Sequence, residues 1–442
     1  MNISVIGGTG YVGLTAAACL AYKGHMVCCV DIDPEKVQLA NQGLSAFYEN
    51  DLEKILKHVA SERRLMATLD YKGPIKDSSI VFLCAGTPSR KDGDIDLSQV
   101  REATRSIARA LKTKKDYFVL VIKSTVMPGT TESVIIPLLE RISGKRAGKD
   151  FGVCVNPEFL REGSAVKDFL FPKEQGIVIG ELDEKSGDWL SKLYQGFDAG
   201  IFRTTINTAE MIKYARNAYL AKDISFANEI ANICQRCNID FLEVKKGLEM
   251  DSRIGKGRFI NAGIGFGGSC FPKDVRALAR KAEKVGIKPR ILRATLEIND
   301  YQPKTFLSLV RQTIGNLKGV KVAVLGLAFK SGTDDLRESR SIPIVLGLLA
   351  EGAVLHVFDS KAGGRAKSIF GNKVHYSGTA KEALISADAC IITTESAEFA
   401  DPKLYDHMRG NFIFDGRRVL NCKRLNRRFI YAAIGFPAGD KI

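Results

Sequence analysis

Residues 2–31 read NISVIGGTGYVGLTAAACLAYKGHMVCCVD, and their order of apolar, glycine and acidic positions indicates the type of fold. A short apolar strand opens this stretch, three glycines with the spacing GxGxxG follow at Gly8, Gly10 and Gly13, and an apolar helix leads to a second strand that ends at Asp31. Strand, glycine turn, helix, strand and acid in this order predict a βαβ unit that binds a dinucleotide.

The glycines and the acid indicate which dinucleotide is bound. Gly8 allows the tight turn, Gly10 lets backbone amides approach a pyrophosphate, and Gly13 lets the helix pack closely on the strand. Asp31 stands where a carboxylate accepts hydrogen bonds from the adenosine ribose hydroxyls. Because this carboxylate would repel a 2′-phosphate, the sequence predicts NAD rather than NADP as the cofactor.

The composition is that of a folded globular protein. The chain has 442 residues, enough for about three domains of roughly 150 residues, with 45% hydrophobic and 26% charged residues. Its net charge of +15 suits an anionic partner, either nucleic acid or a phosphorylated small molecule. Since no motif combines aromatic and basic residues, we expect no nucleic-acid partner, and we expect the basic cluster at residues 417–428 to be a solvated face.

Targeting signals and cysteines point to a reducing compartment. No apolar run approaches the roughly 18 residues of a membrane helix, and the N-terminus enters the first strand directly, so we expect no membrane partner and a cytoplasmic location. The ten cysteines are scattered, which suits reduced thiols. Cys234 and Cys237 form one CxxC pair without a second pair or a nearby histidine, so no metal site is expected.

The opening pattern is repeated in the second half of the chain. Further strands are predicted at 80–84, 118–122, 152–155, 320–325 and 389–393, and the helical period over 208–237 indicates one long helix. LAYKGHMVCCVDID (20–33) and LLAEGAVLHVFDSK (348–361) share the order helix end, glycine, strand and acid. The second half lacks GxGxxG, so its ligand must be held differently.

These patterns predict an α/β protein with two Rossmann-like doubly wound domains joined by a long central helix and a helical middle domain. The expected boundaries are 1–205 for an NAD-binding domain, 206–305 for a helical dimerisation domain, and 306–442 for a second Rossmann-like domain.

The segment FGGSCFPKD, residues 266–274, carries the strongest chemical signal. Two glycines bring the backbone close to a ligand, and Cys270 lies near Lys273 and Asp274. Cationic neighbours and free amides make a thiolate available. A cysteine is more often a buried core residue, but this glycine-rich, charged setting favours a nucleophile.

Other candidate residues follow from position. Lys213 and Asn217 are four apart on the long helix and share one face, where both could donate to an oxygen that develops charge. Thr125, Glu158 and Glu162 follow predicted strands, whose carboxyl ends bind ligands in this fold.

Taken together, these segments resemble the UDP-glucose 6-dehydrogenase family, which belongs to the UDP-glucose/GDP-mannose dehydrogenases. The matching pieces cover nearly the whole chain, and FGGSCFPKD is very specific to the family. They are Gly8–Gly13, Asp31, Gly86-Thr87-Pro88, Lys123-Ser124-Thr125, Asn156–Gly163, Lys213 with Asn217, Asp251–Gly255, Phe266–Asp274, Gly326–Lys330, Thr333–Ser339 and Asp415-Gly416-Arg417.

The resemblance implies a four-electron oxidation of the C6 alcohol of UDP-glucose to a carboxylate, with two NAD molecules and one water. Cys270 would attack the C6 aldehyde, a second hydride loss would give a thioester, and water would release UDP-glucuronate. Lys213 and Asn217 would stabilise the oxyanions. Asp274 and Thr125 would arrange proton transfer and water, and Glu158 would be the base for hydrolysis.

The resemblance also implies binding residues and a homodimer through the central helix, in which an arginine such as Arg253 can enter the partner's site. The implied cofactor contacts are Gly8, Gly10, Tyr11, Val12, Gly13, Asp31, Lys36, Thr87, Thr125, Glu162, Lys273 and Arg337. The implied UDP-glucose contacts are Glu158, Phe159, Leu160, Arg161, Lys213, Asn217, Arg253, Phe266, Gly267, Lys330 and Arg417.

Three alternatives stay open. The loop Asn261-Ala262-Gly263 departs from the family pattern beside the sugar pocket, so GDP-mannose or another nucleotide sugar is the runner-up substrate. A two-electron hydroxyacid dehydrogenase needs neither the cysteine nor a second Rossmann-like half. A nucleic-acid-binding protein would produce no NADH and would bind in a salt-sensitive way.

Overall fold

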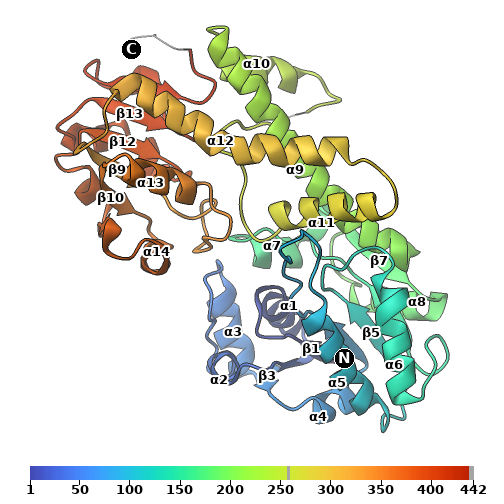
Figure 1. Ribbon diagram of the computed structural model, residues 1–442. Helices are drawn as coiled ribbons and strands as arrows, with labels where there is room; N and C mark the ends of the chain where they lie inside the picture. The colour runs from blue at the N-terminus through green and yellow to red at the C-terminus, as the bar shows by residue number, and fades with distance from the viewer. Residues whose placement is uncertain (256–258, 438–442) are drawn as a thin grey trace. The chain divides into compact units, whose positions relative to one another are not determined.

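The computed structural model describes residues 1–255 and 259–437 (Figure 1). The chain divides into two compact units, residues 1–216 and 217–442. The division falls inside one helix, α9 (Ile206–Arg236), the long green helix of Figure 1. The expected third domain runs to residue 442, and its last five residues lie outside the described ones.

Unit 1 is built on an eight-stranded sheet in the order β3-β2-β1-β4-β5-β6-β7-β8. The first six strands of that order are parallel, as predicted for this sheet, although β3 was not among the predicted strands. Strands β7 and β8 were not predicted, and β7 pairs with β6 antiparallel. The strands are β1 (Asn2–Ile6), β2 (Met26–Val30), β3 (Leu65–Thr68), β4 (Ile80–Leu83), β5 (Val119–Ile122), β6 (Gly152–Val155), β7 (Ile177–Glu181) and β8 (Ile201–Thr205).

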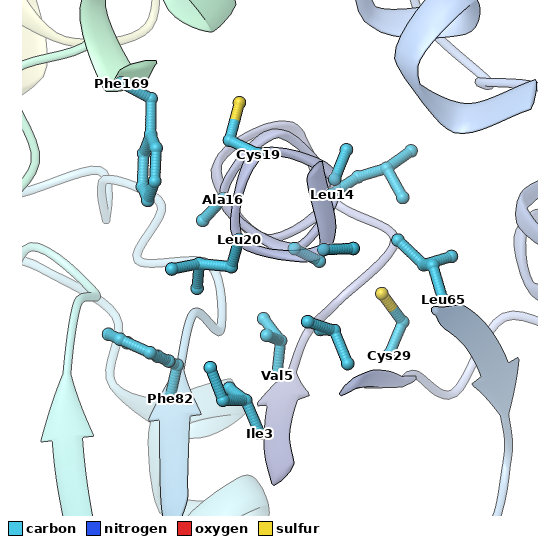
Figure 2. Close-up of a cluster of buried hydrophobic side chains, with 14 of the residues drawn as sticks. Ile3, Val5, Leu14, Ala16, Cys19, Leu20, Cys29, Leu65, Phe82 and Phe169 are labelled. Atoms are coloured by element: carbon cyan, nitrogen blue, oxygen red, sulfur yellow. The ribbon is translucent and has the colours of Figure 1, made fainter. Parts of the chain in front are cut away.

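Helices cover both faces of this sheet, because its strands carry apolar side chains on both sides. Ile3 and Val5 pack toward α1, α3, α7 and α8, whereas Ile6 packs toward α4, α5 and α6. Figure 2 shows Leu14 and Leu20 of α1 in the layer with Ile3, Val5 and Phe82 of the strands. The helices are α1 (Tyr11–Tyr22), α2 (Pro34–Asn41), α3 (Leu52–Ser61), α4 (Lys72–Asp77), α5 (Ser98–Leu111), η1 (Thr131–Ile135), α6 (Ile136–Ser143), α7 (Ala165–Leu170), η2 (Pro172–Glu174) and α8 (Glu184–Leu193).

Unit 2 contains a six-stranded, fully parallel sheet in the order β11-β10-β9-β12-β13-β14. This is the order of the first six strands of unit 1, so the predicted second Rossmann-like fold is confirmed. The strands are β9 (Lys321–Leu325), β10 (Val354–Phe358), β11 (His375–Tyr376), β12 (Ala389–Ile392), β13 (Phe412–Asp415) and β14 (Ile430–Ala433). The helices of this sheet are α13 (Ser341–Ala350), α14 (Gly363–Phe370), η3 (Gly371–Lys373), α15 (Ala380–Leu384), η4 (Ala397–Ala400), η5 (Pro402–His407) and η6 (Cys422–Arg424).

A helical segment precedes the second sheet. It contains α9, α10 (Phe241–Met250), α11 (Phe271–Lys284) and α12 (Arg290–Ile314). The expected boundary after residue 305 lies inside α12, which continues through Pro303, and the three-domain division stays a prediction. Across the described ranges, no helix has the length and apolar character needed to cross a membrane.

Candidate active site

The first glycine loop lies at the carboxyl end of β1 and the start of α1. A Cβ on Gly13 would lie 2.2 Å from the Gly7 carbonyl oxygen, and one on Gly8 would lie 2.5 Å from the Val5 carbonyl oxygen. No side chain caps α1 in the described structure. The Oγ1 atom of Thr9 is buried and has no hydrogen-bond partner among the described residues. The uncapped amides at the start of α1 and the Thr9 hydroxyl are suitable hydrogen-bond donors for the pyrophosphate of NAD.

Asp31 follows β2 and is held beside this loop. Its Oδ2 accepts a hydrogen bond from Thr9 N at 3.0 Å, and its Oδ1 accepts one from Ile32 N at 2.8 Å. Lys36, also expected to contact the cofactor, pairs with Asp33 at 2.8 Å.

Tyr11 connects the glycine loop to the segment after β6. Its hydroxyl donates to Glu49, and burial and this carboxylate raise the pKa of Tyr11. Glu49 also accepts hydrogen bonds from Gly163 N at 2.7 Å and Ala165 N at 2.9 Å, so it fixes the chain just beyond Glu162. Sequence reasoning missed Glu49, because its partners are far away in the chain.

Glu158 and Lys213 form the central pair of unit 1. The Lys213 Nζ donates to the Glu158 carbonyl oxygen and to its Oε1, both at 2.7 Å. The two side chains are only 7% and 6% exposed. Burial works against the charged form of Glu158, but the Lys213 ammonium and the hydrogen bonds from Lys213 and Leu160 outweigh it, so the pKa of Glu158 lies below its ordinary value.

Other expected residues of unit 1 lie in the segments that follow strands β4, β5 and β6. Thr87 and Thr125 are half-buried after β4 and β5. Phe159 lies under Arg216, with 3.7 Å between the guanidinium carbon and the ring centroid. Arg161 forms an ion pair with Asp168 at 2.6 Å, so its guanidinium already has a partner.

Cys270 lies at the N-cap of α11, where amide dipoles stabilise negative charge. It is half-buried, with its Sγ 3.5 Å from Ser269 Oγ. One turn further, Asp274 is buried and accepts hydrogen bonds from Asn217 Nδ2 at 2.6 Å and Lys273 Nζ at 2.5 Å. Unit 2 therefore brings Cys270, Asn217, Lys273 and Asp274 together. Lys213 and Asn217 donate to two different carboxylates, Glu158 and Asp274.

The loop before the cysteine is tightly fixed. A Cβ on Gly267 would lie 2.3 Å from the Glu338 carbonyl oxygen, and Gly268 has a φ of +83° with the Phe329 ring beside it. Asn299, fully buried, accepts from Phe266 N at 2.7 Å and donates to Phe266 O at 3.0 Å. Asn299 was not predicted as a site residue.

A pocket of about 560 Å³ lies at the carboxyl ends of β12 and β13 in unit 2. Arg417 lines it, and its guanidinium donates to Thr393 O at 2.9 Å and Gly265 O at 3.1 Å. The other lining residues include Lys245, Asn261, Ser331, Glu395 and Arg418. A pocket of this size accommodates a nucleotide-sized ligand.

Of the expected ligand residues in the described part of unit 2, only Arg417 lines that pocket. Arg253 is highly exposed, pairs with Asp251 at 2.6 Å and borders a second, apolar pocket of about 430 Å³. Arg337 pairs with Asp335 at 2.7 Å. Lys330 is half-buried, with its Nζ 5.8 Å from the centre of the Phe329 ring.

Comparison with known proteins identifies the family. Models of the UDP-glucose/GDP-mannose dehydrogenase family match its NAD binding domain at residues 1–198, its central domain at 207–301 and its UDP binding domain at 323–422. A UDP-glucose 6-dehydrogenase of Haloferax volcanii is 43% identical over 95% of this chain and 97% of its own length. A GDP-mannose 6-dehydrogenase of Pseudomonas aeruginosa is 43% identical over 81% of each chain.

A solved UDP-glucose dehydrogenase of the hyperthermophilic archaeon Pyrobaculum islandicum has a TM-score of 0.91 and 37% identity, covering 98% of this chain and 97% of that one. NAD is the cofactor of this chain, as the glycine loop and Asp31 predicted. The chain belongs to the UDP-glucose/GDP-mannose dehydrogenase family and is an NAD-dependent nucleotide-sugar dehydrogenase.

Proposed function

We propose that this enzyme oxidises the C6 alcohol of UDP-glucose to the carboxylate of UDP-glucuronate, using two NAD and one water. One observation carries the proposal: Cys270 is at the N-cap of α11, and Asp274, one turn further, is hydrogen-bonded to Asn217. A nucleophile is required for a four-electron oxidation that passes through a covalent intermediate, whereas a two-electron alcohol oxidation needs none.

In the first half of the reaction, the C6 hydroxyl loses a proton and a hydride and becomes an aldehyde. NAD, when bound, supplies the acceptor for the hydride in each oxidation. Thr125 and Asp274 are the proposed residues that order the water and carry the proton. Lys213 and Asn217 donate hydrogen bonds to the oxygen as it gains negative charge, which is the role of an oxyanion site.

In the second half, the Cys270 thiolate adds to the aldehyde carbon and forms a thiohemiacetal. The thiohemiacetal then loses its hydroxyl proton and a second hydride, for which bound NAD would be the acceptor, and becomes a thioester. Glu158 takes a proton from water, the water oxygen bonds to the acyl carbon, and the sulfur–carbon bond breaks to release the acid and regenerate the thiolate. Glu158 is suited to this role because Lys213 keeps its carboxyl ionised.

Hydride transfer and substrate binding involve the remaining residues. Glu162 is proposed to lie near the nicotinamide, and Arg337 and Lys273 to contact the cofactor. Arg417 and Lys330 are proposed to hold the UDP part of the substrate. The pocket that Arg417 and Lys245 line supports an anionic ligand, because both side chains are cationic.

The runner-up substrate is GDP-mannose or another nucleotide sugar. The Haloferax and Pseudomonas relatives are equally identical to this chain, but the first aligns over 95% of it and the second over 81%. The greater coverage supports UDP-glucose.

The decisive experiment mixes the enzyme with NAD and a panel of nucleotide sugars, and counts the NADH formed per sugar consumed. We expect two NADH per UDP-glucose. A ratio of one contradicts the four-electron mechanism, and turnover with GDP-mannose alone moves the assignment to the runner-up.

The same proposal includes a homodimer through α9 and a cytoplasmic location. The dimer is supported by exposed apolar side chains on α9, among them Tyr219, Phe226 and Ile233. Within it, Arg253 is proposed to reach the partner's site. The location is supported by the cysteines, all ten of which lie in the described residues as free thiols.

A further inference from the structure

A second buried lysine lies beside the Glu158–Lys213 pair and has no role in the reaction proposed above. Lys123 follows β5 and is 5% exposed. Its Nζ donates to Asn156 Oδ1 at 2.8 Å and to Asn156 O at 3.4 Å. The contact arises because β5 and β6 pair with Ile122 opposite Val155, so the residue after each strand meets its neighbour at one edge.

Asn156 is itself held on three sides. Its Oδ1 also accepts from the Tyr194 hydroxyl at 2.6 Å, and its Nδ2 donates to Val178 O at 2.8 Å. Glu158 is two residues further along the chain, and Lys213 Nζ donates hydrogen bonds to its carbonyl oxygen and its carboxylate. The buried ammonium groups of Lys123 and Lys213 therefore hold the segment 156–158 by hydrogen bonds, one at each end.

Burial of the Lys123 ammonium is unfavourable for folding, which indicates that its charge serves the neighbouring carboxylate. Within the described residues, Lys123 forms no ion pair, and its acceptors are the two amide oxygens of Asn156. Burying a charge without a counter-ion is unfavourable, and an apolar side chain in its place is often neutral or stabilising. Burial lowers the pKa of Lys123 to about 8, so the side chain still carries its charge at neutral pH.

The charged groups around Lys123 show where its charge acts. Glu158 and Lys213 interact with it electrostatically, as does the Cys84 thiol at the end of β4. Cys84 is neutral at physiological pH because burial raises its pKa to about 12. The rings of Phe82 and Phe169 lie within 6 Å of the ammonium. Arg216 of α9 also has a favourable electrostatic interaction with Glu158.

We propose that Lys123 is a positioning residue for thioester hydrolysis: through Asn156 it fixes the segment that carries Glu158, and its charge helps keep Glu158 ionised. The inference rests on the proposed function, because it assigns Lys123 to the step that Glu158 performs. Lys213 contacts Glu158 directly, whereas Lys123 acts through Asn156 and through its electric field.

The test compares Lys123→Met with a matched control, Lys114→Met. Lys114 is 3% exposed, donates to Lys76 O at 2.7 Å and lies 5.5 Å from the Phe118 ring centroid. The charged groups that act on it are Asp77, Asp116 and Lys145, and not Glu158. Each variant loses one buried ammonium. The measurement is the decay rate of the cysteine adduct after mixing with UDP-glucose and NAD, followed by quenching and mass spectrometry from acidic to neutral pH.

In Lys123→Met we expect the pH at which adduct decay becomes half-maximal to rise, since Glu158 loses an opposite charge that favours its ionised form. Well below that pH, decay slows about tenfold for each unit of the shift. The amount of adduct formed stays the same. Lys114→Met keeps the wild-type pH dependence, and thermal unfolding shows whether both variants are folded.

Asn156→Asp provides the test if Lys123→Met does not fold. It preserves the shape and the acceptor oxygen, and it neutralises Lys123 in an ion pair, so the same upward shift is expected. Unchanged pH dependence of decay in a folded Lys123→Met or Asn156→Asp protein overturns the inference alone. A wild-type enzyme that forms no cysteine adduct with any nucleotide sugar overturns the proposed function and, with it, this inference.

Discussion

Cys270 and Glu158 are the two residues whose proposed roles are easiest to separate. Glu158→Gln keeps an oxygen that can accept from Lys213 but loses the basic carboxylate, so we expect a burst of about two NADH per site and an accumulated covalent adduct. Cys270→Ser should give no thioester, because an alkoxide is much harder to form than a thiolate. Rapid mixing with UDP-glucose and NAD, followed by intact mass measurement, distinguishes the two variants. An adduct on another residue removes Cys270 from the mechanism.

Asp31 is predicted to select NAD and to hold the glycine loop at the same time. Asp31→Asn loses a charge that repels a 2′-phosphate, and it leaves one oxygen to serve Thr9 N and Ile32 N. We expect KM for NAD to rise about tenfold or more, as for loss of a hydrogen bond to a charged group, and discrimination against NADP to weaken. Asp70→Asn is the control, since its carboxylate also accepts two backbone amides, at 2.9 and 3.0 Å, after β3. Equal kinetics in both variants would assign the ribose contact elsewhere.

Among the secondary-structure elements, the internal repeat was predictable, and the two halves form the same hydrogen bonds at corresponding positions. Asp31 accepts from Thr9 N after β1, and Asp359 accepts from Leu327 N and Ala328 N after β9, at 2.7 and 2.9 Å. In each half a glycine after the first strand donates to the last carbonyl of the second, Gly7 to Val30 and Gly326 to Phe358. Apolar runs ending in glycine or acid report local structure, which is why sequence alone was sufficient here.

The elements that sequence missed lack that local signal. Strand β8 has Ile201 and Phe202 exposed, so its pattern does not distinguish a buried face. The antiparallel pairing of β7 depends on Gly180 opposite Val155, a tertiary contact. Helix α12 continues through Pro303, a residue that normally ends a helix. Register and strand direction arise from packing between distant segments, which periodicity cannot report.

The packing of β7 against α9 gives a prediction at this scale. A Cβ on Gly180 would lie 2.6 Å from the Ala209 Cβ and 3.0 Å from the Ile206 Cα. Gly180→Ala should therefore force the helix and strand apart and cost about 1–3 kcal/mol, as overpacking usually does. Gly200→Ala is the control, because nothing lies within 4 Å of its Cβ position. Thermal unfolding by circular dichroism should show a lower Tm for Gly180→Ala only. Equal Tm values would mean that β7 and α9 accommodate the added methyl group without loss of stability.

Across the whole molecule, the sequence predicted which residue types form the candidate site, but it did not predict which distant residues form hydrogen bonds with one another. Cys270, Lys213 and Asp31 stand in motifs that sequence displays, whereas Glu49, Asn156 and Asn299 form hydrogen bonds with partners 22 or more residues away. The basic cluster at 417–428 was expected to be solvated, and this was wrong in part. Arg418 is only 6% exposed in its side chain and pairs with Asp240, and Arg417 bonds backbone carbonyls beside the pocket. Positive charge at Arg417 and Arg418 therefore contributes to the folded structure.

The assembly of the whole molecule gives the last prediction. Tyr219, Phe226 and Ile233 are spaced seven residues apart on α9, so they lie along one side of the helix, and they are 52%, 49% and 53% exposed. Tyr219 and Phe226 line the apolar pocket of about 430 Å³, together with Ile254, Ile260, Ile291 and Ile298. An exposed apolar stripe of this kind is stable in water when a second surface covers it.

Phe226→Glu places a charge in the middle of this stripe, and burying an unpaired carboxylate at an interface is unfavourable. We expect the wild-type enzyme to sediment as a dimer and Phe226→Glu to sediment as a monomer, with catalytic activity reduced if Arg253 serves the partner's site. Ile385→Glu is the matched control, because Ile385 is 48% exposed but lies after α15, away from this stripe. Sedimentation velocity measures the outcome. A wild-type monomer, or a Phe226→Glu protein that remains dimeric, would place the interface on another surface, because one buried carboxylate at the centre of the stripe should be enough to dissociate it.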